Sequence, residues 1–115
     1  MREIISTKLI VLLLFVFSMS FNAFSQFIEC NTGVTVNLNC VSSLNGGNLA
    51  FACGDSGTVI KSTTVGSIWV NVTGNGIPSN ANLFNIFAVD NNVVLTAGNI
   101  GTNTYVYRTS SGGSN

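Results

Sequence analysis

Two pairs of glycines with the same internal spacing lie 44 residues apart in this chain. Gly54 and Gly57 form the first pair, and Gly98 and Gly101 form the second. Each pair follows an apolar stretch and precedes one rich in β-branched or aromatic residues, an arrangement that predicts a tight turn between two strands. We therefore expect two copies of one antiparallel β unit.

A second motif follows each glycine pair and combines a hydroxyl residue with a glycine four positions later. Its members are Ser62, Gly66 and Trp69 in the first copy and Thr109 and Gly113 in the second. The two hydroxyl residues are 47 rather than 44 residues apart, because three residues are inserted at 102–104. The repeat therefore continues past the glycine turns into the hairpin that follows them.

The segments around these motifs have the length and composition of short strands. We expect strands at 33–38, 41–44, 49–53, 58–62, 68–72, 83–89, 92–97 and 105–108. Residues 73–82 are rich in Gly, Asn and Ser and read as a connector. Beyond the N-terminal segment, no window keeps the periodicity of a helix. The predicted fold class is all-β.

A repeat of this length built from four short strands indicates the blades of a β-propeller. The sequence predicts antiparallel four-stranded blades at about 41–72 and 83–115, joined by the linker 73–82, with residues 26–40 as a lead-in strand. Propellers close with at least four blades, whereas this chain holds about two. We therefore expect an incomplete propeller, truncated at its C-terminus, with further blades in a longer protein.

Residues 1–25 have the features of a signal peptide. Two basic residues flank the start of an apolar run at 9–17, and a small-residue site follows at 23–25, which predicts cleavage before Gln26. The apolar run of nine residues is too short to cross a bilayer as an ordinary helix. We expect a secreted or cell-surface protein with no membrane span after cleavage, and a retained membrane anchor is the alternative.

The 90 residues of the exported part carry very few charges. Glu29, Asp55 and Asp90 oppose Lys61 and Arg108, which leaves a net charge of −1. Such sparse charge argues against nucleic acid as a partner, because nucleic-acid-binding proteins present a basic face. Histidine is absent and no Cys-x-x-Cys pair occurs, so a zinc site has no support. We expect no cofactor.

Three cysteines in an exported chain make a disulfide possible, because export leads to an oxidising compartment. Cys53 aligns with Ala97 of the second copy, which suggests a small buried position and an inert thiol. Cys30 and Cys40 then form a possible disulfide, which would close a short loop and contribute roughly 2–3 kcal/mol. Three unpaired thiols are the alternative.

Residues 62–69, with the sequence Ser-Thr-Thr-Val-Gly-Ser-Ile-Trp, resemble the Asp-box, or bacterial neuraminidase repeat. The pattern of that repeat is Ser/Thr-x-Asp-x-Gly-x-Thr-Trp, and residues 109–115 look like the start of another copy. Together with the preceding glycine turns, the segments resemble the photosystem II assembly and stability factor-like propeller family. Repeats of this family are widespread in secreted bacterial proteins.

The resemblance implies structural roles for Gly66, Gly113 and Trp69. In an intact Asp-box the Asp carboxylate accepts backbone N–H bonds, the Gly adopts a conformation closed to other residues, and the Trp is buried between sheets. Thr64 and Ser111 stand at the Asp positions, where a hydroxyl makes the same local bond more weakly. We expect fold elements at these positions, with no catalytic or metal site.

Two classes of function remain open. The first is a non-enzymatic binding or scaffold propeller whose partner is an unknown protein or glycan. The second is a fragment of a secreted glycan-active enzyme whose catalytic residues lie outside this chain. The resemblance suggests it because sialidases with Asp-box propellers have sites built from an arginine triad, a tyrosine nucleophile and acids. Arg108 is the only arginine of the exported part, and Asp55 and Asp90 lie in turn signals. The first class is therefore favoured, and we interpret Tyr105 and Tyr107, on one strand face, as packing residues.

Overall fold

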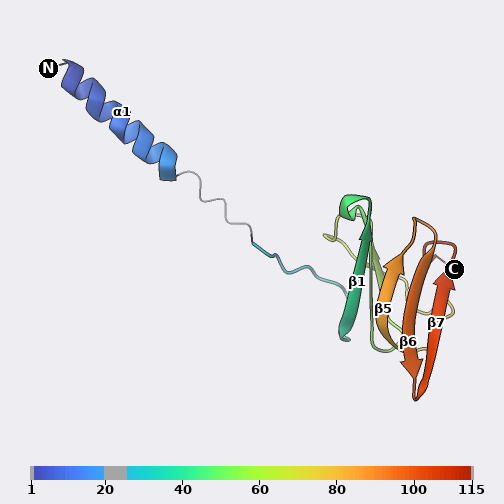
Figure 1. The fold of residues 1–115 in the computed structure, drawn as a ribbon. Helices are drawn as coiled ribbons and strands as arrows, with labels where there is room; N and C mark the ends of the chain where they lie inside the picture. The colour runs from blue at the N-terminus through green and yellow to red at the C-terminus, as the bar shows by residue number, and fades with distance from the viewer. Residues whose placement is uncertain (1, 20–25, 115) are drawn as a thin grey trace.

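The computed structural model describes residues 2–19 and 26–114 (Figure 1). One helix, α1 at Arg2–Met19, lies apart from two β-sheets. Within the described ranges, no helix combines the length and the apolar character that crossing a membrane demands. The cleavage site predicted at 23–25 lies outside the described residues, and the signal peptide stays a prediction.

The first sheet contains four antiparallel strands in the order β1-β2-β3-β4. They are β1 at Leu38–Leu44, β2 at Leu49–Gly54, β3 at Val59–Ser62 and β4 at Val70–Asn71. A short 3₁₀ helix, η1 at Asn45–Gly47, joins β1 to β2. Asn and Gly suit this connection because its backbone takes positive φ angles, +53° at Asn45 and +66° at Gly46.

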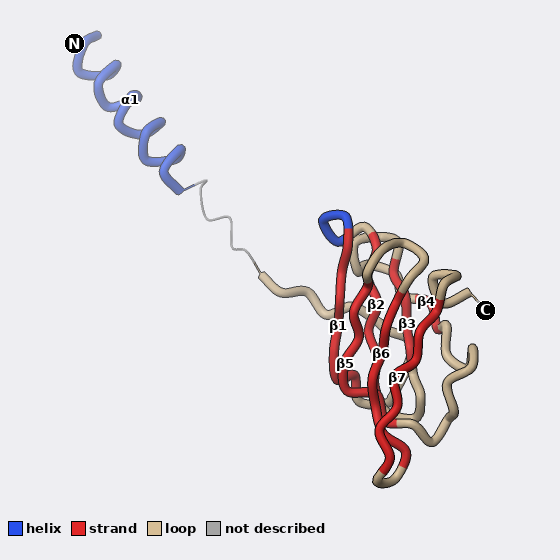
Figure 2. The backbone as a smooth tube through the Cα atoms, turned by 45° about the vertical axis from the view of Figure 1, so that its right-hand side comes forward, coloured by secondary structure: helices blue, strands red, loops and turns tan. Residues whose placement is uncertain are grey.

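The second sheet contains three antiparallel strands in the order β5-β6-β7 (Figure 2). They are β5 at Asn82–Ala88, β6 at Val94–Ile100 and β7 at Asn103–Thr109. The chain after α1 is thus organised into antiparallel sheets of four and three strands. The predicted β character of this part, and its division into two successive antiparallel units, is confirmed.

The strand predicted at 33–38 is wrong, because only Leu38 belongs to a strand. Alternating apolar residues in this segment resemble a half-buried strand, but Gly33 has φ +72°, which is far from an extended conformation. The ladder with β2 begins at Leu38, and β1 runs from there through the strand predicted at 41–44. The pairing partner, and not the local pattern, decides where β1 starts.

The turn predicted at 98–101 is also misplaced. β6 continues to Ile100, which pairs with Asn103 of β7, so the chain reverses only after Ile100. The insertion at 102–104 supplies the extra residues that lengthen this hairpin. Figure 1 shows the β6–β7 hairpin projecting below the other strands.

The two sheets pack face to face, with β1 and β2 against β5. The buried apolar core between them contains Leu49, Phe51, Cys53, Val59, Ala81, Leu83, Ile86, Ala88 and Val94. Hydrogen bonds also join β1 to β5. The Asn39 side-chain amide donates to the Leu83 carbonyl at 2.8 Å, and the Ala88 N–H donates to the Ser42 hydroxyl at 3.1 Å. The sheets are therefore tied together along these two strands.

The sheets stack head to tail. Successive residues of a strand point to opposite faces, so Phe51 points to the second sheet and Ala52 points away from it. The 44-residue repeat makes Phe51 equivalent to Leu95 and Ala52 equivalent to Thr96. In the second sheet, Thr96 lines the space facing Phe51, and its neighbour Leu95 points away. Unlike faces of the repeated unit are therefore in contact.

Candidate functional site

The hydroxyl of Ser62 holds the hairpin that follows β3. Its Oγ accepts hydrogen bonds from the backbone N–H groups of Thr64, at 3.3 Å, and Gly66, at 3.0 Å. Thr64 Oγ1 in turn accepts a bond from the Ile68 N–H at 2.8 Å. These local bonds satisfy backbone donors inside the loop, so both hydroxyls act as turn-forming groups.

The turn that follows β7 repeats this arrangement. Thr109 Oγ1 accepts bonds from the backbone N–H groups of Ser111, at 3.2 Å, and Gly113, at 3.3 Å. Gly113 has φ +80° and Gly66 has φ +81°, in a region that L side chains seldom occupy. The two copies of the hydroxyl–glycine motif thus share one local geometry.

Gly54 and Gly98 lie where a neighbouring strand passes too close for a side chain. A Cβ atom at Gly54 would overlap the carbonyl oxygen of Asn37, and one at Gly98 would overlap that of Asn82. In each sheet this approach coincides with a β-bulge or irregularity in the facing strand, β1 or β5. Backbone crowding therefore requires glycine at both positions.

Gly57 and Gly101, predicted as equivalents, have different surroundings. Gly57 has φ +66°, and its N–H donates to the Ala81 carbonyl at 2.6 Å, which ties the β2–β3 turn to the connector. Gly101 has φ +59°, but a Cβ atom there would have no neighbour within 4 Å. The insertion after Gly101 explains the difference, because the longer hairpin carries this turn away from the sheets.

Trp69 is half-buried and lines a groove with Val41, Ala52 and Ile60. These three residues pair side by side across β1, β2 and β3. They lie on the face of the first sheet that points away from the second sheet, as the alternation along β2 requires. The expected burial of Trp69 where the two sheets meet is therefore wrong, because the hairpin after β3 brings the ring to the outer face.

The three cysteines lie in different environments. Cys53 is buried in the core, as expected, and burial raises the pKa of its thiol to about 11. Cys40 is half-buried on β1 with its sulfur 3.4 Å from the side-chain oxygen of Asn85, and Cys30 is exposed. All three are free thiols in this structure. The disulfide between Cys30 and Cys40 stays a prediction.

Asp55 holds the β2–β3 turn. Its carboxylate oxygens accept bonds from the side-chain amides of Asn37, at 3.2 Å, and Asn39, at 3.0 Å. Asn37 directly precedes β1 and Asn39 lies at its start, so these bonds attach the turn to the edge strand β1. Sequence reasoning does not reveal these partners, because isolated asparagines are common throughout the chain.

Asp90 holds the β5–β6 turn. Its Oδ1 accepts bonds from the N–H groups of Asn92 and Val93, both at 2.7 Å, and these bonds lower the pKa of the carboxyl group. The seven residues of β5 separate this turn from the end of the sheets where Asp55 lies, a distance of roughly 20 Å. The two aspartates are therefore too far apart to act as an acid–base pair.

A cavity of about 160 Å³ lies between the two sheets. Its floor is formed by Ile86, Thr96 and Tyr107, which pair side by side across β5, β6 and β7. Phe51 and Val59 of the first sheet face this floor. The rim is formed by residues of the connector and of the end of β7, namely Asn75, Gly76, Ile77, Arg108 and Thr109. The interior is therefore largely apolar and the rim partly polar.

The ring of Tyr107 is held in place by a second ring. Tyr105 and Tyr107 share one face of β7, as expected, and their ring centroids lie 6.3 Å apart in a stacked arrangement. Such pairs add a modest stabilisation beyond the area that they bury. The stack therefore extends the aromatic part of the cavity floor toward Tyr105.

In the part of the chain that the structure describes, no group of three or more His, Cys, Asp or Glu side chains is placed to hold a metal ion. Comparison with protein-family models, with curated proteins and with solved structures finds no match for this chain.

Proposed function

We propose that this chain is an exported β-propeller module that binds a protein or a glycan without chemical turnover. The head-to-tail stacking of the two sheets carries the proposal. In a propeller each blade turns the same face toward the next blade, so unlike faces meet. Phe51 and its equivalent Leu95 follow this rule, since only Phe51 belongs to the core between the sheets. A two-fold arrangement of repeats would bring like faces together instead.

The recurring hairpins support the assignment of both units to the Asp-box repeats of the photosystem II assembly and stability factor-like family. Ser62 and Thr109 open the two hairpins with the same pattern of accepted bonds. The hydroxyl of Thr64, at the Asp position, accepts the Ile68 N–H bond as a carboxylate does in an intact box. The proposed repeats span about 41–72 and 83–115, with the linker at 73–82.

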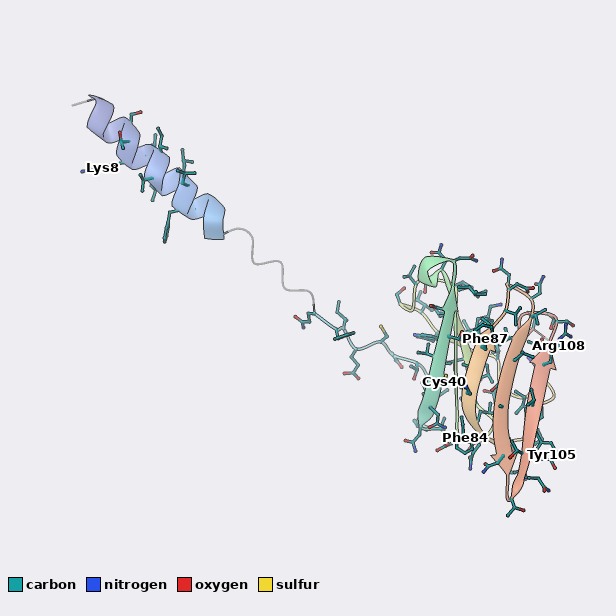
Figure 3. All side chains as sticks on the ribbon, in the orientation of Figure 1. Lys8, Cys40, Phe84, Phe87, Tyr105 and Arg108 are labelled. Carbon is teal, nitrogen blue, oxygen red and sulfur yellow. The ribbon has the colours of Figure 1, made fainter. Side chains whose placement is uncertain are left out.

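Exposed apolar residues on the second sheet are consistent with a neighbouring blade. Phe84 is 55% exposed, Phe87 is 61% exposed and Val106 is 70% exposed. Figure 3 shows Phe84 and Phe87 along β5, and Tyr105 and Arg108 along β7. Repeat units bury their apolar faces against neighbours on both sides. We propose that further blades complete the propeller in the full-length protein.

The positions of the aspartates favour a binding role over catalysis. The carboxylates of Asp55 and Asp90 accept the bonds that shape two turns at opposite ends of the sheets. A mechanism that uses two carboxyl groups as acid and base needs both to reach one substrate. Loops at the ends of such sheets are free to vary and commonly carry the binding residues of a module of this kind.

The test expresses the full chain with a C-terminal affinity tag in a bacterial host and analyses the exported fraction. Mass spectrometry is expected to find Gln26 at the amino terminus, and an intact Met1 in that fraction would contradict export. The purified product is then assayed on a fluorogenic sialoside and on a glycan array. Glycan capture without hydrolysis supports the proposal, and hydrolysis of the sialoside overturns its non-enzymatic part.

A further inference from the structure

We infer that Cys40 and Cys53 form a redox site, at which the two thiols join in a disulfide between β1 and β2 when they meet a disulfide oxidant. The strand register places Cys40 directly opposite Cys53. This bond excludes the one that the sequence suggests between Cys30 and Cys40, because both need the same Cys40 thiol. The site does not depend on the binding function proposed above.

The β1–β2 ladder holds the two backbones at a separation that suits a disulfide. From the pair Cys40–Cys53 to the pair Leu44–Leu49 the register runs without a shift, and the irregularity of this ladder lies before Cys40. Directly opposite residues of an antiparallel pair have Cα atoms about 4.5 or 5.5 Å apart. Disulfides form at Cα separations of roughly 4.4–6.8 Å. The two backbones are therefore already within range.

Both thiols lie on the face of the first sheet that meets the second sheet. The less exposed residues of β1 alternate with exposed ones, and their partners on β2 are all buried. The pairs on this face are Cys40–Cys53, Ser42–Phe51 and Leu44–Leu49. Cys53 belongs to the core and Cys40 packs against that core. The side chains of the two cysteines therefore leave the sheet on the same side.

The surroundings of the thiols favour Cys53 over Cys30 as the partner of Cys40. The pKa of Cys53 is raised chiefly by burial, and the charge of the Cys40 thiolate adds to the rise, as close proximity requires. The Cys53 thiol also forms a hydrogen bond with the backbone of Cys40. Cys30 is exposed in the segment before β1, where its thiol lies 3.7 Å from the carbonyl oxygen of Ile28. Folding therefore gives Cys53 the higher effective concentration at Cys40.

The oxidant reaches Cys40 first, because Cys40 is half-buried and Cys53 is 0% exposed. The Cys40 thiolate attacks one sulfur of oxidised glutathione, which forms a mixed disulfide and releases one glutathione thiolate. Cys53 then loses its proton and attacks the Cys40 sulfur, which closes the bond and releases the second glutathione. The protein gives up two electrons and two protons, and these convert one oxidised glutathione into two reduced molecules. An oxidising compartment, which export would provide, contains disulfide oxidants of this class.

The bond is specific to the first sheet. The pair at the equivalent position of the second sheet is Asn85 and Ala97, which holds no thiol. In the first sheet the bond would fix the edge strand β1 to β2 next to the β2–β3 turn. The structure holds the reduced form, in which the Cys53 thiol still titrates.

The test equilibrates the purified full chain with mixtures of reduced and oxidised glutathione and then alkylates the remaining thiols. The intact mass is expected to show one internal disulfide and one alkylated thiol. Chymotrypsin separates the three cysteines, because it cleaves after large apolar residues, here Leu38, Leu44 and Phe51. The linked peptides are expected to contain Cys40 and Cys53. A link from Cys30 to Cys40, or mixed disulfides with glutathione and no internal link, overturns the inference.

Two variants separate the pair from the third thiol. Cys30→Ala is the matched control and is expected to leave the equilibrium constant for oxidation unchanged. Cys53→Ala, which introduces the residue found at the equivalent position 97, leaves only the Cys30 and Cys40 thiols. These two are expected to pair at least tenfold less readily at the same glutathione ratio. If they pair as readily as in the wild type, Cys53 is not the partner of Cys40.

The same equilibrium measured in concentrated urea shows whether the fold holds the pair together. Closing a loop of this length in an unfolded chain carries an entropy cost that corresponds to about 100-fold in the equilibrium constant, and strain in the native bond lowers that factor. Unfolding is therefore expected to weaken the Cys40–Cys53 bond by roughly 10-fold to 100-fold. Equal constants in native buffer and in urea would show that the β1–β2 ladder does not bring the thiols together, and would overturn the inference.

Discussion

Phe51 and Leu95 occupy equivalent positions in two successive sheets, yet Phe51 is 1% exposed and Leu95 is only half-buried. The difference follows from head-to-tail stacking, because the face that the first sheet turns inward is the face that the second sheet turns outward. Similar residues in similar strands therefore make unequal contributions to stability.

Truncation of these two side chains measures that inequality. Phe51→Ala is expected to lower the free energy of unfolding by about 3–5 kcal/mol, since it empties a packed site in the core. Leu95→Ala is expected to cost about 1 kcal/mol, because its side chain remains partly in water. Chemical denaturation followed by circular dichroism gives both values. Equal losses would contradict the stacking of unlike faces.

The two crowded glycines give a second prediction. Gly54→Ala and Gly98→Ala are each expected to destabilise the fold by about 2 kcal/mol or more, because the new Cβ meets a carbonyl oxygen that the bulge holds in place. Gly101→Ala is the control. A Cβ atom at Gly101 has open space around it, so the only cost is the strain of an L residue at φ +59°. A loss of stability of about 1 kcal/mol is expected. Thermal unfolding of the three variants measures these losses of stability. Equal losses in all three would show that backbone crowding is not the cause.

The sequence predicts the parts of the fold that depend on local chemistry. The turn at 54–57 is predicted from its two glycines, of which Gly57 takes φ +66°, and β2 and β3 follow from apolar stretches bounded by turn residues. The segment 33–37 shows the limit of such reasoning. It alternates as a strand does, but strand formation requires a partner, and the partner β2 pairs only from Leu38 onward.

The cavity and the position of Trp69 lie further beyond local reasoning. Both depend on which face of a strand meets another sheet. That choice is made by packing between residues distant in the sequence, such as Phe51 of β2 and Ile86 of β5, which are 35 residues apart. The hydroxyl–glycine hairpins are the opposite case. Ser62 and Gly66 are four residues apart and their bond is local, so the pattern in the sequence carries the geometry.

Val65 has a backbone conformation that is unfavourable for a β-branched residue. Its φ is +57°, while the equivalent position in the second hairpin is Gly112 with φ +64°. A β-branched residue in the left-handed region is strained, by roughly 1–2 kcal/mol. Val65→Gly is therefore expected to raise the free energy of unfolding by about 1 kcal/mol, after the greater freedom of glycine in the unfolded chain is subtracted. The reverse change, Gly112→Val, is expected to destabilise the fold. If chemical denaturation shows that Val65→Gly loses stability, Val65 is not strained.

The buried thiol of Cys53 predicts how stability depends on alkaline pH. Burial raises its pKa from 9.0 to about 11, so the unfolded chain ionises first as the pH rises. The stabilisation is complete below pH 9 and is lost between about pH 9 and 11, where the folded state still holds the proton. Cys53→Ala, the residue found at the equivalent position 97, is expected to flatten this part of the profile. Urea titrations at several pH values give the free energy of unfolding of wild type and variant. If both decrease in parallel as the pH rises, other groups cause the loss.

Thr64 provides the last prediction, because it stands where an intact Asp-box has a carboxylate. Its Oγ1 accepts the Ile68 N–H bond at 2.8 Å. A charged acceptor strengthens such a bond, so Thr64→Asp is expected to raise the free energy of unfolding by about 0.5–1 kcal/mol, and Thr64→Val to lower it by about 1 kcal/mol. Thr63→Asp adds the same charge at the neighbouring exposed position and is expected to change stability little. If the two Asp variants behave alike in guanidinium denaturation, the effect is one of net charge, and the hydroxyl of Thr64 does not replace the carboxylate of the repeat.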